Sequence, residues 1–144
     1  MTNIFLLDNF DSFTYNLVDQ FRTLGYPVRI YRNSLPASRI MQEIDACEGD
    51  AVLVLSPGPG APHEAGCLID LIKLARGRVP ILGICYGQQT LAHQLGGTVE
   101  GGHAAEFGRA DIEIKAASPL FEGCWQVGGR YPGWMSHGDR VTQL

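Results

Sequence analysis

The stretch that decides the fold is Pro80-Ile-Leu-Gly-Ile-Cys-Tyr-Gly-Gln-Gln-Thr90. Its first half continues an apolar run and predicts a buried strand over Val79–Ile84. Its second half opens a segment with polar residues and helical spacing, which predicts a helix over Gln88–Leu95. Cys85 stands at the junction, where the chain must turn sharply from the strand into the helix.

The glycines on either side of Cys85 favour a chemical role for this cysteine. Gly83 and Gly87 complete a Gly-x-Cys-x-Gly arrangement, which is typical of a nucleophile elbow. We expect side chains at the two glycine positions to clash with neighbouring structure. The free N–H groups of the following helix favour a thiolate and lower a thiol pKa from its free value of about 8.5. The alternative interpretation is a buried structural cysteine, which is common for an isolated Cys.

Outward from this stretch, strands and helices alternate along the chain. We predict further strands over Ile4–Leu7, Val28–Tyr31 and Ala51–Leu55, and further helices from a cap at Ser12 or Thr14 to Leu24, over Pro36–Ala46 and over Leu68–Leu74. Apolar strands alternating with helices predict an α/β fold with three layers, a mostly parallel open sheet and helices on both faces, as in flavodoxin-like folds. We expect residues 1–144 to form one domain.

Beyond Gly97 the pattern changes. Short alternating segments at Ala110–Ile114 and Trp134–Met135 predict antiparallel strands added to one edge of the sheet, and Met135–Asp139 reads as a tight polar turn. The antiparallel edge looks incomplete.

A second loop belongs to the same edge of the sheet. Ser56-Pro-Gly-Pro-Gly60 follows the strand Ala51–Leu55, and the carboxyl ends of parallel strands are where ligands bind in open α/β folds. Gly58 and Gly60 bring bare backbone close to a ligand, so their N–H groups could serve an oxyanion or a carbonyl. A plain Gly/Pro turn is the alternative. The loop is not a phosphate-binding Walker loop, because no Gly-Lys-Ser/Thr follows.

Composition excludes several classes of protein. The chain has 144 residues, 45% of them apolar and 18% charged, with a net charge of −4. This composition argues against disorder, and no apolar run approaches the roughly 20 residues of a membrane span. No basic stripe suits nucleic acid. The four cysteines and four histidines lack zinc-ligand spacing. We expect a reduced cytoplasmic protein with free thiols, no metal and no cofactor.

The motifs together resemble the class I (triad) glutamine amidotransferases. Ile84–Gln89 after Pro80–Gly83, with Ser56–Gly60 upstream, carries the resemblance. The first 84 residues resemble the amidotransferase component of anthranilate synthase and its aminodeoxychorismate relative, in Leu6–Asn16, Tyr31–Asn33, Leu55–Pro62 and Glu64–Cys67. The remainder is similar to the amidotransferase domain of GMP synthetase, in Cys85–Thr90, Gln94–Gly97, Glu106–Gly108 and Trp134–Thr142.

The resemblance implies a reaction and a set of residues. Cys85 attacks the glutamine amide, a glutamyl thioester forms, and ammonia passes to a synthase. The N–H groups of Gly58 and Tyr86 would hold the oxyanion. Implied substrate-binding residues are Gly58, Pro59, Gly60, Gln89, Ser136 and His137. An implied synthase interface is the loop of Asn9, Phe10, Asp11 and Ser12, unless Phe10 and Phe13 pack inward.

One family feature is missing from this sequence. The family's catalytic His and Glu lie in a His-Pro-Glu motif, which does not occur here, so the resemblance implies a C-terminally truncated domain. Among the histidines, His137 is the one plausible stand-in for the base. We rank an anthranilate-type glutaminase first and a GMP synthetase glutaminase second. A catalytically silent binding module and a cysteine peptidase on a related fold are alternatives of other classes.

Overall fold

A computed structural model describes residues 1–59 and 64–143, except for the side chains of residues 102–106 and 136. The chain divides into two compact units, Met1–Val99 with Val141–Leu144, and Glu100–Arg140. The expectation of one domain stays a prediction.

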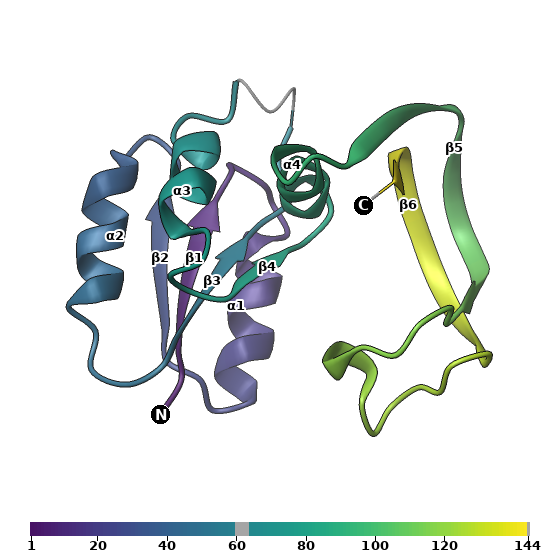
Figure 1. The fold of residues 1–144 in the computed structure, drawn as a ribbon, viewed down its shortest axis with the longest axis horizontal. Helices are drawn as coiled ribbons and strands as arrows, with labels where there is room; N and C mark the ends of the chain where they lie inside the picture. Colours follow the sequence, from purple (N-terminus) through teal and green to yellow (C-terminus); the bar gives the residue numbers. More distant parts are fainter. Residues whose placement is uncertain (60–63, 144) are drawn as a thin grey trace. The chain divides into compact units, whose positions relative to one another are not determined.

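The first unit is built on a four-stranded sheet. Its strands, in spatial order, are β2 (Val28–Arg32), β1 (Asn3–Asp8), β3 (Ala51–Leu55) and β4 (Ile81–Gly83). All three neighbouring pairs are parallel. Their carboxyl ends therefore meet at one edge of the sheet, as the sequence predicted (Figure 1).

Helices cover both faces of this sheet. They are α1 (Thr14–Thr23), α2 (Ala37–Asp45), α3 (Leu68–Ala75) and α4 (Tyr86–Gln94). Alternate residues of β1 enter two separate clusters, because successive side chains of a strand point to opposite faces. Ile4 and Leu6 pack with Val18 of α1, whereas Phe5 and Leu7 pack with residues of α2, α3 and α4. The predicted three-layer α/β arrangement is confirmed. In the described part of the chain, no helix is long and apolar enough to cross a lipid bilayer.

The start of α1 differs from its prediction. Neither Ser12 nor Thr14 caps the helix; Phe13 occupies the N-cap position and makes no side-chain capping bond. Thr14 is instead the first helical residue, and its hydroxyl donates to Asp8 Oδ1 at 2.9 Å. The hydroxyl is drawn toward the end of β1 because Thr14 is buried there. The predicted end of the helix is confirmed, with Gly25 at φ +84°.

Most of a second, separate sheet lies in the second unit. β5 (Thr98–Glu113) pairs with β6 (Arg130–Gln143), and the two form a separate two-stranded sheet. The strands run in opposite directions and are joined by residues 114–129 (Figure 1). The strands predicted at Ala110–Ile114 and Trp134–Met135 are confirmed as parts of β5, which ends at Glu113, and of β6. Two other predictions are wrong for the described residues: these strands do not extend the parallel sheet, and Met135–Asp139 is strand rather than turn. Consecutive antiparallel strands satisfy each other's backbone groups, so the pairing continues through the polar segment.

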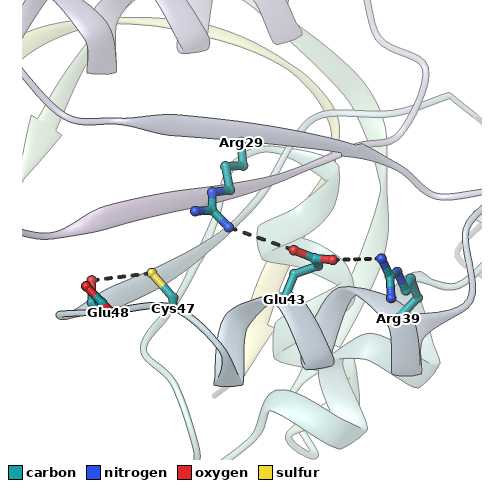
Figure 2. Close-up of polar contacts among 5 residues, drawn as sticks. All are labelled: Arg29, Arg39, Glu43, Cys47 and Glu48. Carbon is teal, nitrogen blue, oxygen red and sulfur yellow. Dashed lines mark hydrogen bonds and ion pairs between the residues drawn. The ribbon is translucent and has the colours of Figure 1, made fainter.

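A surface charge network ties α2 to the edge strand β2 (Figure 2). Glu43 lies 2.9 Å from Arg39, one turn earlier on α2, and 3.8 Å from Arg29 of β2. The Arg29 guanidinium also lies 5.5 Å from the ring centroid of buried Phe5. Exposed ion pairs contribute about 0–1 kcal/mol, so apolar packing rather than this network holds the unit together.

The contribution of the apolar core to the free energy of unfolding can be measured by substitution. Leu53 is fully buried in the centre of β3, so Leu53→Ala should lower the free energy of unfolding by about 2–5 kcal/mol. Glu43→Gln, which breaks the surface network, should lower it by less than about 1 kcal/mol. Urea unfolding followed by circular dichroism measures both. Equal losses in the two variants would contradict this ranking.

Candidate active site

Cys85 occupies the sharp turn that the sequence predicted. Its backbone lies at φ +51° and ψ −113°, a left-handed conformation that non-glycine residues rarely adopt. The helix α4 begins at the next residue, Tyr86, rather than at the predicted Gln88, and Cys85 itself is the N-cap. Cys85 is exposed. The earlier helix start brings the first turn of α4 directly to the thiol-bearing residue.

The flanking glycines are required by close packing, as predicted. A Cβ on Gly87 would overlap the Leu55 carbonyl oxygen and lie 2.7 Å from Leu55 Cβ. A Cβ on Gly83 would lie 2.5 Å from Gln88 Cα. The first turn of α4 therefore sits against the end of β3 at a distance that only glycine allows.

The Gly58 loop lies beside this turn. The Ile84 N–H donates to the Leu55 carbonyl at 3.0 Å, which holds the chain before Cys85 next to the chain before Ser56. A Cβ on Gly58 would lie 3.2 Å from Tyr86 Cδ1. The structure thus brings together the two motifs that the sequence singled out, although they are separated by more than twenty residues in the chain. Gly60 lies outside the described residues.

The remaining predicted substrate contacts divide between the two units. Gln89 is half-buried in the first turn of α4, and its N–H donates to the Cys85 carbonyl at 3.0 Å. Pro59 is exposed beside Gly58. His137 lies in β6 and belongs to the second unit, as does Ser136, whose side chain is outside the described atoms. The first unit therefore gathers Cys85, Tyr86, Gly58, Pro59 and Gln89, and the second unit carries the other two.

The loop after β1 has both exposed and buried residues. Phe10 and Phe13 have 54% and 62% of their surface exposed, so the alternative in which they pack inward is wrong. Asn9 is the opposite case. Only 2% of it is exposed, and its side-chain amide donates to the Ser56 carbonyl at 3.0 Å. The prediction that Asn9 belongs to a partner interface is corrected, because its side chain is committed to the interior.

Sequence reasoning also missed the partners of Asn9. Ser56 is fully buried and Asn33 is 6% exposed, and both bond to Asn9. Each of these polar residues directly follows a strand of the parallel sheet. That position was a signal that they face one another at the carboxyl edge of the sheet.

The surroundings of Cys85 disfavour its thiolate, whereas the sequence predicted that the helix would favour it. Partial burial of the sulfur, together with the negative charge of Asp11, raises the pKa of the Cys85 thiol above its ordinary value. The sequence predicted a lowered pKa from the helix N-terminus alone. Asp11 follows β1 and Cys85 follows β4, so the same convergence of strand ends that builds the site also brings this carboxylate toward the thiol.

Comparison with known proteins decides the family. The sequence profile described as "Glutamine amidotransferase class-I" matches residues 5–144. The chain belongs to the class I glutamine amidotransferase family. Anthranilate synthase component 2 of Vibrio parahaemolyticus is 58% identical over 101 residues, which are 70% of this chain and 51% of that protein. The glutamine-hydrolysing GMP synthase of Agrobacterium fabrum is 61% identical over 98 residues, covering 64% of this chain and 18% of that protein.

Solved structures agree with this assignment. A Thermoplasma acidophilum protein assigned to the GMP synthases matches with a TM-score of 0.77 and 27% identity, over 99% of this chain and 67% of that one. A glutamine amidotransferase from Thermotoga maritima shares the fold, with a TM-score of 0.70 at 20% identity. The chain spans about half the length of the anthranilate synthase relative that it matches (51%). Both subfamilies named from the sequence motifs are thus among its relatives.

The close packing at the turn yields a first prediction for this site. Gly87→Ala should lower the free energy of unfolding by about 1–3 kcal/mol, because the new methyl group overlaps the Leu55 carbonyl. Gly101→Ala is the matched control, since its Cβ would lie at an ordinary 3.6 Å from Asp139 Oδ1. Urea unfolding of both variants measures the difference. A Gly87→Ala variant as stable as the control would show that α4 does not need this close approach.

The charge near the thiol yields a second prediction. Asp11→Asn removes a negative charge that disfavours the thiolate, so the pKa of Cys85 should fall and its alkylation by iodoacetamide at neutral pH should accelerate. The rate at Cys85, followed by peptide mass spectrometry across a pH series, gives the midpoint. Asp70→Asn is the control, because Asp70 acts on the thiol of Cys67. A midpoint that stays in place in Asp11→Asn, or moves to higher pH, would contradict the role of Asp11.

Proposed function

We propose that this chain is the glutaminase part of an amidotransferase, with Cys85 as its nucleophile. The observation that supports this most is the glycine-flanked cysteine at φ +51°, with α4 starting at the next residue and the Gly58 main chain beside Tyr86. Strained backbone at an exposed cysteine is the kind of local cost that accompanies function.

In the proposed reaction the Cys85 thiolate attacks the side-chain amide carbon of glutamine. The electrons of the carbonyl move onto its oxygen, and the N–H groups of Gly58 and Tyr86 donate to that oxyanion. The oxyanion collapses, the C–N bond breaks, and the nitrogen leaves as ammonia after accepting a proton. Water then hydrolyses the glutamyl thioester to glutamate and frees the thiol. One oxyanion donor contributes about 10²–10³-fold in rate.

We assign the other predicted residues to substrate binding within this proposal. Gln89 on the first turn of α4 and Pro59 after Gly58 would contact the glutamine side chain; the predicted role of Gly60, which lies outside the described residues, stays a prediction. Ser136 and His137 of β6 belong to the second unit, and their part in substrate binding stays a prediction. A general base for Cys85 is also needed; the sequence contains no His-Pro-Glu, the motif that carries the catalytic His and Glu in the family.

We propose that the ammonia passes to a synthase subunit or domain, with the anthranilate synthase type ranked first. The match to anthranilate synthase component 2 supports this, because it covers 70% of the chain at 58% identity. A second candidate is the glutaminase domain of a GMP synthase, which the 61% identical relative favours. The exposed ring of Phe10, with Asp11 and Ser12, is the surface that we propose for the synthase. A thiol nucleophile suits the reducing cytoplasm, and the four cysteines are free thiols.

The proposed function is tested with a glutamine analogue in which a chloromethyl ketone replaces the amide. We expect it to label Cys85 in this chain, at a rate that added glutamine lowers, and we expect no label in Cys85→Ser. Cys124→Ser is the matched control, since Cys124 is the other exposed cysteine, and it should react as the unchanged protein does. Labelling shared between Cys85 and Cys124, or labelling that glutamine does not slow, would refute the proposal.

A further inference from the structure

Asn9 holds a buried polar junction at the carboxyl edge of the sheet. It directly follows β1 and is 2% exposed. Its backbone N–H donates to Ser56 Oγ at 3.0 Å, and its side-chain amide donates to the Ser56 carbonyl at 3.0 Å. Its side-chain oxygen accepts from Asn33 Nδ2 at 3.3 Å. Both hydrogen bonds that Asn9 donates therefore fix the residue from which the Gly58 loop starts.

Ser56 transmits this constraint toward Gly58. Its N–H donates to the Leu7 carbonyl at 3.1 Å, and its hydroxyl donates to the Pro57 carbonyl at 2.8 Å. The hydroxyl thus accepts from Asn9 on one side and donates to the loop on the other. With both the hydroxyl and the carbonyl engaged, hydrogen bonds hold the peptide groups at Ser56 and Pro57 in this orientation.

Gly58 also touches Asn9 directly. A Cβ on Gly58 would lie 2.6 Å from Asn9 Cβ and 3.1 Å from the Asn9 carbonyl oxygen. The Gly58 backbone therefore packs closely against both Asn9 and the Tyr86 ring. A shift of Asn9 would move the Gly58 N–H relative to Cys85, because the loop both starts from the Ser56 that Asn9 holds and packs on Asn9 itself.

We propose that Asn9 is a positioning residue that aims the Gly58 N–H at the oxyanion. It touches neither glutamine nor the thiol, and it acts through Ser56 and through its contact with Gly58. This inference rests on the proposed glutaminase function. It also gives Asn9 a role that differs from the neighbouring Phe10, whose ring is exposed.

Two substitutions of Asn9 test the proposal in the full chain. Asn9→Ala removes both side-chain bonds, and Asn9→Asp keeps the size but removes the amide donor to the Ser56 carbonyl. We expect each to lower the saturating rate of labelling by the chloromethyl ketone analogue by about 10–100-fold, because a displaced donor loses its hold on the developing oxyanion. Alkylation of Cys85 by iodoacetamide, which needs no oxyanion donor, should stay within about twofold in both variants when each rate is taken at the plateau of its pH series, where the added charge of Asn9→Asp no longer changes the thiolate fraction.

Asn3→Ala is the matched control. Asn3 begins the same strand β1 at its opposite end, where its side chain donates to the Glu48 and Asp50 carbonyls at 3.3 and 3.4 Å. This substitution removes an asparagine side chain that bridges two chain segments. Asn3 itself lies at the end of β1 that is away from the Gly58 loop. We expect its labelling rate with the ketone to match that of the unchanged protein. If Asn9→Ala fails to fold by circular dichroism, Asn9→Asp carries the test.

The possible outcomes distinguish a failure of the proposed role of Asn9 from a failure of the proposed glutaminase function. Glutamine-sensitive labelling in the unchanged protein, with equal rates in folded Asn9→Asp, would overturn the role of Asn9 and leave the proposed function standing. The same holds if iodoacetamide slows in parallel with the ketone, or if Asn3→Ala slows as much. Absence of glutamine-sensitive labelling in the unchanged protein would overturn the proposed function itself, and the inference with it.

Discussion

The contact between the first turn of α4 and the end of β3 is the constraint on which the site depends. Gly87 packs against Leu55 so closely that a single methyl group would not fit, and the Ile84 N–H bonds to the Leu55 carbonyl. This contact forces the sharp turn at Cys85 and the left-handed backbone of that residue. It also sets the Gly58 loop, which continues from the same strand, beside Tyr86. One packing contact therefore creates both the exposed cysteine and its neighbouring backbone donors.

Much of the parallel core could be predicted from the sequence, for a physical reason. Strands buried on both faces appear as continuous apolar runs, such as Ala51–Leu55, and each is followed by a segment with helical spacing. The elbow could be predicted as well, because Gly83 and Gly87 are needed wherever a helix packs so close to a strand. The C-terminal region could be predicted only in part: the short alternating segments at Ala110–Ile114 and Trp134–Met135 correspond to parts of β5 and β6, but the glycines and polar residues around them carry no regular period. There, pairing between backbones decides the structure rather than side-chain pattern.

The site was harder to predict than the fold because its details depend on distant neighbours. Asn9 looked like part of an exposed polar loop, but Ser56 and Asn33, from two other strand ends, draw it inside. The thiol of Cys85 looked activated by its helix, but burial and Asp11 raise its pKa. Both differences arise from the parallel topology, which gathers the ends of β1, β2, β3 and β4 at one edge. Sequence patterns describe each of these loops separately, whereas the burial of Asn9 and the pKa of Cys85 depend on contacts between the loops.

We propose that the turn at Cys85 and the Gly58 loop together form one oxyanion-binding site. A crystal structure of the chain after covalent reaction with the chloromethyl ketone analogue tests this most directly. We expect a bond from Cys85 Sγ to the analogue, with the ketone oxygen about 2.7–3.1 Å from the backbone nitrogens of both Gly58 and Tyr86. A ketone oxygen that faces solvent, or that lies beyond hydrogen-bond reach of both nitrogens, would contradict it.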